Sequence, residues 1–263
     1  MNAATARRLL ELNRGFYDAF AADFADSRRA LQPGMTRALE AIAPFRSMLD
    51  VGCGDGRVGR ALAEGVVAPA PRRYVGVDYS HNLVLQAPAT FPNGYVFMLC
   101  DVARAGWSDD VDEWLRLRSP ARGTPQSGAR PALRRFDAAV CFSALHHIPG
   151  ARRRLRLMRE MRSLLKPGGR CVVSVWQFLH VPRLARKIAP WSEAGLRPEQ
   201  VDEGDVVVDW RRGGRGLRYV HHFTQAELID LCRRAGFDMI ETYRSDGQTG
   251  DMGLYIVLKA VLY

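Results

Sequence analysis

The sequence predicts an α/β fold in which a mostly parallel β-sheet is covered by helices on both faces. Short apolar segments recur along the chain and alternate with stretches of helical periodicity. The first apolar segment leads directly into a glycine-rich turn, and the next two each end near an aspartate. Strands that alternate with helices are joined by right-handed crossovers, so this order indicates a parallel sheet.

Seven strands and a C-terminal helix are expected. The strands are placed at residues 47–51, 74–77, 95–99, 136–142, 171–176, 238–243 and 254–261. The helix is expected over residues 224–235, because Thr224 with Glu227 has the pattern of a capping box and Gly236 stands where a helix ends.

The chain length and the interruptions of the strand–helix alternation predict one domain with insertions. A chain of 263 residues suits a single α/β domain over residues 1–263. Residues 1–46 are expected to form an N-terminal helical cap, because apolar residues recur there at helical spacing. Residues 103–135 are expected to be a flexible insertion loop, since they hold a run rich in serine, proline and glycine. Residues 180–217 interrupt the alternation and are expected to form a substrate-side insertion.

The composition argues against a membrane-spanning, secreted or metal-binding protein. With 47% hydrophobic residues the chain can bury a full core, and it has no apolar run of about 18 residues that would predict a membrane span. No secretion signal is expected at the N-terminus. The five cysteines are far apart and form no C-x-x-C pair, so no zinc or other metal site is expected. A reducing cytoplasmic location fits, with a nuclear location as the alternative in a eukaryote.

The net charge suggests a partner but does not prove one. A formal charge of +10 suits a polyanion such as RNA. Only three of the 38 basic residues are lysines, however, and such a preference for arginine also arises from a GC-rich coding sequence alone.

Two groups of arginines need separate interpretations. One group has the spacing of a solvated helix face: Arg152, Arg153, Arg156 and Arg159. The other lies beside Trp210, and arginine next to an aromatic ring suits stacked bases and phosphates: Arg211, Arg212, Arg215 and Arg218.

The glycine-rich turn, residues 50–56, is the first candidate for a cofactor site. Glycines after a buried strand let the backbone lie against a ligand, although this pattern alone also fits a dinucleotide. A phosphate would need surroundings that favour an anion. Asp50 and Asp55 instead place negative charge at the turn, which suits a cation such as the sulfonium of S-adenosylmethionine (SAM).

Later strands supply more candidates. Asp78 stands about 20 residues after the turn, where a carboxylate can accept hydrogen bonds from ribose hydroxyls. Asp101 could flank the adenine, with Val102 packed near the ring. Each acid alone is more often a solvated loop residue, but the ordered set, followed by Ser-Ala-Leu-His-His after the fourth strand, is far more specific.

This ordered set resembles class I SAM-dependent methyltransferases over residues 48–175. The resemblance implies a Rossmann-like, seven-stranded, mostly parallel sheet with its last strand antiparallel. It also implies SAM as cofactor, with these contacts: Tyr17, Asp50, Gly52, Cys53, Gly54, Asp78, Tyr79, Asp101, Val102, Ala144, Leu145 and His146.

Four further segments, residues 16–28, 142–148, 204–210 and 218–228, narrow the resemblance. In this order they are similar to the methyltransferases that esterify 5-carboxymethyluridine at the tRNA wobble position, a module also found in AlkB-like tRNA-modifying enzymes. Val220 departs from the family's Arg-Tyr-Tyr-His pattern. The resemblance implies tRNA as substrate and, as in eukaryotic relatives, a small activator subunit as a further partner.

The chemistry of methyl transfer suggests which residues bind the methyl acceptor. A carboxylate nucleophile is already ionised at neutral pH, so the protein only has to position it. A group of polar side chains that holds the carboxylate, called the acceptor clamp, is therefore expected. The candidates for this clamp are Arg28, Arg218, Tyr219 and His221. Tyr17 and Phe24 would lie over the cofactor. A nitrogen or phenol nucleophile would instead need a base, for which His146 or His147 is the candidate.

Simpler interpretations stay open. Arg218 could be a surface arginine, Tyr219 a core residue and His147 a structural histidine. A small-molecule O- or N-methyltransferase is the alternative function, and a catalytically silent SAM-binding scaffold is a third.

Overall fold

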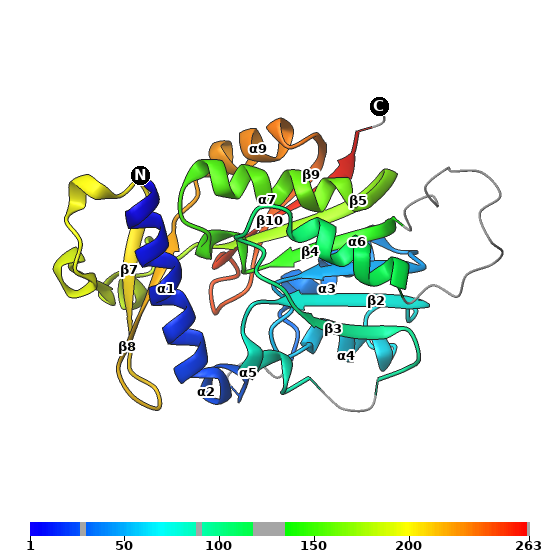
Figure 1. Ribbon diagram of the computed structural model, residues 1–263, viewed down its shortest axis with the longest axis horizontal. Coiled ribbons are helices and arrows are strands. Elements are labelled where there is room, and N and C mark those ends of the chain that lie inside the picture. Colours follow the sequence, from blue (N-terminus) through cyan, green and yellow to red (C-terminus); the bar gives the residue numbers. More distant parts are fainter. Residues whose placement is uncertain (27–29, 88–90, 118–134, 262–263) are drawn as a thin grey trace.

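A seven-stranded sheet forms the centre of the computed structural model, which describes residues 1–26, 30–87, 91–117 and 135–261 (Figure 1). Its strands are β1 (Ser47–Val51), β2 (Arg73–Asp78), β3 (Tyr95–Leu99), β4 (Phe136–Phe142), β5 (Leu165–Trp176), β9 (Phe237–Ser245) and β10 (Gly253–Ala260). The order is β3-β2-β1-β4-β5-β10-β9. Strands β1 to β5 pair in parallel, and β10 is antiparallel to both β5 and β9. The predicted mostly parallel sheet with an antiparallel last strand is confirmed.

Helices cover both faces of this sheet. One face carries α3 (Pro33–Ile42) and α4 (Arg57–Ala63), and the other carries α6 (Trp107–Leu117), α7 (Ala151–Ser163) and α9 (Gln225–Arg234). The side chains of β4 alternate between the two layers, as the pleat of a strand requires. The N-terminus of α9 is capped as predicted, because the Thr224 hydroxyl accepts a hydrogen bond from the Glu227 N–H at 3.1 Å.

The expectation of a flexible loop over residues 103–135 is wrong for its first part. Residues 107–117 form α6, which buries Trp107, Val111 and Leu115 in the core. These three apolar residues stand four apart, which is the spacing of one helix face. The run rich in serine and glycine begins only after this helix, and residues 118–134 lie outside the described part of the chain.

The N-terminal segment divides into two parts. Helix α3 belongs to a layer of the main sheet, whereas α1 (Ala3–Ala19) and α2 (Ala21–Asp26) lie at the edge of the fold near the short helix α5 (His81–Val84). Figure 1 shows α1 running beside a second sheet. The helical cap expected over residues 1–46 is therefore α1 and α2 alone.

The second sheet begins within the expected insertion, residues 180–217, but its last strand continues beyond it to residue 221. After α8 (Pro182–Ala185), the antiparallel strands β6 (Ile188–Ala189), β7 (Asp205–Trp210) and β8 (Gly216–His221) pair in this order. Three short 3-10 turns complete the part of the chain that the structure describes: η1 (Leu145–His147), η2 (Trp191–Ala194) and η3 (Pro198–Gln200). Within the described ranges, none of the helices has the length and apolar character needed to cross a membrane.

Candidate active site

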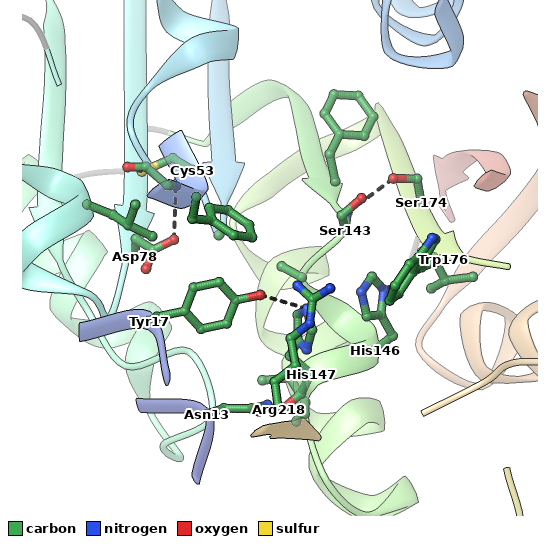
Figure 2. Close-up of a pocket in the computed structure, with 18 of the residues that line it drawn as sticks. Asn13, Tyr17, Cys53, Asp78, Ser143, His146, His147, Ser174, Trp176 and Arg218 are labelled. Atoms are coloured by element: carbon green, nitrogen blue, oxygen red, sulfur yellow. Dashed lines mark hydrogen bonds between the residues drawn. The ribbon is translucent and has the colours of Figure 1, made fainter. Parts of the chain in front are cut away.

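A cavity of about 250 Å³ opens where β1, β2 and β4 end, and α1 and β8 contribute residues to its other side (Figure 2). Strands β1 and β4 are neighbours in the sheet, and the chain leaves β1 toward β2 on one side and β4 toward β5 on the other. Ligands of open α/β sheets bind at such a switch point.

Two glycines of the turn after β1 line this cavity for different reasons. Gly52 has φ +76°, and a Cβ there would stand 2.4 Å from the Cβ of Ala144, so the residue must be glycine. Gly54 has φ +57°, but a Cβ there would meet no protein atom within 4 Å. The turn therefore packs closely at Gly52 and leaves room for a ligand at Gly54.

The Asp78 carboxylate is fixed by the backbone on both of its oxygens. Oδ2 accepts a hydrogen bond from the Gly54 N–H and Oδ1 one from the Ser80 N–H, each at 2.9 Å. Burial raises the pKa of Asp78, and these hydrogen bonds oppose the rise. Each oxygen retains a lone pair, so the carboxylate can still accept hydrogen bonds from the two hydroxyls of a ribose.

Asp50 does not face the cavity, contrary to the expectation that it contacts SAM. Its side chain is buried behind the turn, where Oδ2 accepts a hydrogen bond from the Tyr74 hydroxyl at 2.5 Å. Burial raises the pKa of Asp50 to about 7, although the Tyr74 hydrogen bond lowers it. Asp55 does line the cavity and pairs with Arg60 at 3.2 Å. The neighbouring Cys53 also lines it.

Asp101 and Val102 line the cavity after β3, and their place beside the adenine stays a prediction. Asp101 Oδ1 accepts a hydrogen bond from the Ala103 N–H at 3.0 Å, and Oδ2 pairs with Arg14 at 2.5 Å. Arg14 belongs to α1, so this ion pair links the helix to the segment that follows β3 of the main sheet. Sequence reasoning missed Arg14.

Three aromatic residues predicted or considered for the cofactor meet at α1. Tyr17 and Phe24 line the cavity with their rings edge to face and centroids 4.9 Å apart. Tyr79 also lines it, and its hydroxyl donates to the Asn13 carbonyl at 3.2 Å.

His147 is engaged at both ring nitrogens. Nδ1 lies 2.9 Å from the Tyr219 carbonyl oxygen, and Nε2 lies 2.9 Å from the Tyr17 hydroxyl, which Figure 2 shows directed at the ring. Because a carbonyl only accepts, Nδ1 carries the proton of the neutral ring and Nε2 accepts from Tyr17. The geometry makes His147 a structural link between η1, α1 and β8.

The segment after β4 brings two of three expected residues to the cavity. Ala144 and His146 line it, whereas Leu145 is fully buried in the core because the turn of η1 directs it inward. His146 Nδ1 accepts a hydrogen bond from the Trp176 N–H at 3.3 Å.

The four candidates for the acceptor clamp are not brought together. Side chains of a strand alternate, so Arg218 of β8 faces the cavity while Tyr219 and His221 face away from it. The Tyr219 hydroxyl donates to Asp205 at 2.6 Å, and His221 Nδ1 lies 2.7 Å from the same oxygen. Arg28 lies outside the described residues.

His221 belongs to a buried charged cluster instead. Its Nε2 lies 2.9 Å from Glu227, which also stands 3.7 Å from the buried Arg154. Burial lowers the pKa of His221, but the hydrogen bonds to Asp205 and Glu227 outweigh this effect and raise it. The cluster joins β7, β8, α7 and α9, so its role is to hold the second sheet on the main fold.

Arg218 is a buried arginine held by aromatic rings. Its guanidinium lies 5.1 Å from the ring centroid of Trp176, 5.4 Å from that of Phe16 and 5.5 Å from that of Trp210. The residue is 5% exposed. Within the described chain no carboxylate pairs with it, and its Nε has no hydrogen-bond partner. The cavity therefore contains a cation available to an anionic ligand.

Sequence reasoning also missed Asn13. Its Oδ1 accepts a hydrogen bond from the Tyr219 N–H at 2.7 Å, and its Nδ2 lies 3.2 Å from the carbonyl oxygens of both Tyr219 and His147. The signal was present, because Asn13 is a polar residue between Leu9 and Phe16 on the buried face of α1.

Three of the arginines considered for RNA contact make contacts within the protein. Arg211 and Arg215 both pair with Asp209, and Arg215 also pairs with Glu193 at 2.5 Å. On α7, Arg156 donates to the Ala103 carbonyl at 2.6 Å.

Comparison with known proteins identifies the fold and the family. A family model described as a methyltransferase domain matches residues 24–242. The chain belongs to the methyltransferase domain family. The enzyme is thus a methyltransferase, and the cavity after β1, β2 and β4 is its candidate active site.

Curated relatives of this methyltransferase differ in length. A protein of Encephalitozoon cuniculi (strain GB-M1), named as a methyltransferase, is 28% identical over 93% of both chains. The tRNA (carboxymethyluridine(34)-5-O)-methyltransferase of Schizosaccharomyces pombe is 22% identical over 86% of this chain and 88% of its own. Mouse ALKBH8, which carries the same activity name, is 23% identical over 72% of this chain but only 22% of its own length.

Solved structures show the same fold. A SAM-dependent methyltransferase of Methanosarcina mazei has TM-score 0.58 and 20% identity over 89% of this chain and all of its own. DhpI, solved with SAM, has TM-score 0.60 and 20% identity over 95% and 97% of the two chains. A Haloferax volcanii protein, solved with the Trm112 methyltransferase activator, has TM-score 0.58 and 17% identity over 95% and 98%.

The residues present fit SAM, the methyl donor of SAM-dependent methyltransferases. Asp78 would hold the ribose, Asp101 and Val102 would flank the adenine, and the open space at Gly54 would admit the ligand close to the backbone. When bound, SAM supplies an electrophilic methyl group on its sulfonium.

Proposed function

We propose that this methyltransferase esterifies the carboxylate of 5-carboxymethyluridine at the wobble position of a tRNA. The observation that carries the proposal is Arg218, a buried cation that faces the cavity without an acidic partner in the described part of the chain. A guanidinium binds a carboxylate through two parallel hydrogen bonds, which both neutralises and orients it.

The contacts of His147 suit a nucleophile that needs no base. A carboxylate is ionised at neutral pH, so the protein has only to align it with the methyl group and exclude water. His147 already binds Tyr17 and the Tyr219 carbonyl, which leaves neither ring nitrogen as an evident base. Helix α1 and strand β8 both contribute residues to the wall of the cavity.

Support for tRNA as the substrate comes from the relatives and from charge. The Schizosaccharomyces pombe relative, named for this activity, matches most of both chains, and the chain has a formal net charge of +10. We propose a small activator subunit as a second partner, because the Haloferax volcanii neighbour is bound to such a protein.

The test is transfer of label from methyl-labelled SAM to tRNA that lacks the terminal ester, with and without an added Trm112-type activator. We expect label in the wobble nucleoside, released as methanol by mild alkali. Arg218→Gln should lower kcat/KM about 10- to 100-fold, the value of a charged hydrogen-bonded pair. Arg152→Gln, on the exposed side of α7, is the matched control and should keep full activity.

Two results would overturn the proposal. Label that enters a ribonuclease-resistant small molecule but no RNA would show the small-molecule methyltransferase instead. Binding of SAM in calorimetry without transfer to any acceptor in a cell extract would show the silent scaffold.

A further inference from the structure

Arg57 is a second cavity arginine whose guanidinium is not satisfied by the protein. It is the first residue of α4, directly after the glycine turn, and it lines the cavity. Its Nη1 is buried and has no hydrogen-bond partner, and no carboxylate forms an ion pair with it among the residues that the structure describes. A buried charged group without a partner is unfavourable, so this atom is expected to meet a ligand.

The acids whose charges act on Arg57 are each held by another group. They include Asp55, Asp50 and Asp246. Asp55 pairs with Arg60 at 3.2 Å, and Asp50 accepts from the Tyr74 hydroxyl at 2.5 Å.

Asp246, which also lines the cavity, is held most firmly. Its Oδ1 accepts a hydrogen bond from the Gly34 N–H at 2.8 Å, and its Oδ2 accepts one from the Tyr255 hydroxyl at 2.5 Å. In the described part of the chain none of these three acids forms an ion pair with Arg57, so its donors stay available for an anion that enters the cavity.

The position of Arg57 in the cavity indicates which anionic group it binds. The residues that fit adenosine, Asp78 and Asp101, follow β2 and β3 on one side of β1. Of the groups whose charges act on Arg57, Asp55 and Asp50 belong to the turn after β1 itself. The other two, Asp246 and Tyr255, come from β10 and the connection between β9 and β10, on the other side of β1. SAM carries its only carboxylate at the end remote from the adenine. We infer that Arg57 binds the methionine carboxylate of SAM, whereas Arg218 is left for the acceptor.

The test compares SAM with decarboxylated SAM, which lacks only this carboxylate, by calorimetry. The wild type should bind SAM about 10- to 100-fold more tightly, as a charged hydrogen-bonded pair implies. Arg57→Gln should bind both ligands equally, with the affinity that the wild type has for decarboxylated SAM. That ligand also reports whether the variant has folded. Arg57→Lys keeps the charge and should retain part of the preference.

Three results for the wild type and the Arg57 variants would each overturn the inference: a wild type without preference for SAM, an Arg57→Gln protein that keeps the preference, or an Arg57→Lys protein that loses it entirely. Arg218→Gln should keep the full preference. If Arg218→Gln abolishes it instead, Arg218 binds the methionine carboxylate and the assignment of the two arginines is wrong. No acceptor is present in this experiment, so a failure to label tRNA would leave the result for Arg57 unaffected.

Discussion

The side chain of Asn13 binds the backbone of Tyr219, a residue 206 positions away in the chain. Its Oδ1 accepts from the Tyr219 N–H at 2.7 Å, and its Nδ2 lies 3.2 Å from the Tyr219 carbonyl oxygen. Arg218 is the adjacent residue of β8, so this contact between α1 and β8 determines where the cavity cation lies.

Replacing Asn13 should therefore reduce both stability and acceptor binding. Asn13→Ala removes three hydrogen bonds and leaves the buried Tyr219 N–H without a partner, which should lower the free energy of unfolding by about 2 to 3 kcal/mol. Urea unfolding measures this loss. Asn82→Ala, which removes one exposed hydrogen bond, is the control and should cost under about 0.5 kcal/mol. Equal losses in the two variants would contradict the role given to Asn13.

The two glycines of the turn should respond differently to a methyl group. Gly52→Ala places a Cβ 2.4 Å from that of Ala144 and should destabilise the protein by more than the roughly 1 kcal/mol expected for positive φ alone. Gly54→Ala meets no protein atom and should cost only that smaller amount. It should instead weaken binding of S-adenosylhomocysteine, measured by calorimetry. The reverse ranking in stability would show that the turn is packed differently.

The pKa of Asp50, raised to about 7, predicts a pH-dependent stability. The folded protein holds this proton up to about pH 7, whereas the unfolded chain releases it near pH 4. The free energy of unfolding attributable to Asp50 should therefore fall as pH rises through this window, by up to about 1.4 kcal/mol per pH unit.

Urea unfolding of the wild type and Asp50→Asn between pH 5 and 9 checks this prediction. The wild type should lose stability relative to the variant up to about pH 7 and no further above it. Tyr74→Phe removes the hydrogen bond that lowers the pKa of Asp50 and should extend the loss to higher pH. A difference that does not change with pH would contradict a buried carboxyl with a raised pKa.

His221 should also make the free energy of unfolding depend on pH, in a pH range above that of Asp50. Its raised pKa means that its charge stabilises the fold fully below the unfolded value near 6.5 and that this contribution is lost as pH rises through the folded value. The stability difference between the wild type and His221→Gln should thus be larger at pH 6 than at pH 9. Glu227→Gln removes one cause of the raised pKa and should reduce this pH dependence.

Much of the sheet could be predicted because its signals are local. The bounds of β1, β3 and β4 agree with the expected ranges, and the alternation along the chain indicated the parallel order. Helix α6 was missed because the composition of the run after it dominated the whole segment. The alternation of β8 was equally readable, and it would have separated Arg218 from Tyr219 and His221.

The site was less predictable because its geometry depends on contacts between distant segments. Nothing local to Asp50 shows that Tyr74 binds it behind the turn. Asn13 and Arg14 belong to a helix without a motif, and they reach the cavity only through the docking of α1. Arg57 stood next to the glycine turn, but its lack of a partner can be seen only when Asp55 and Asp246 are in place.

The three hydrogen bonds of the Asn13 side chain all end on main-chain atoms, those of Tyr219 and His147. A main-chain contact does not depend on which side chain the contacted residue carries. The residues of β8 can therefore be exchanged during evolution while the joint with α1 is preserved. Under the proposed role of residue 218, a substitution there would change the acceptor preference and leave the joint with α1 intact.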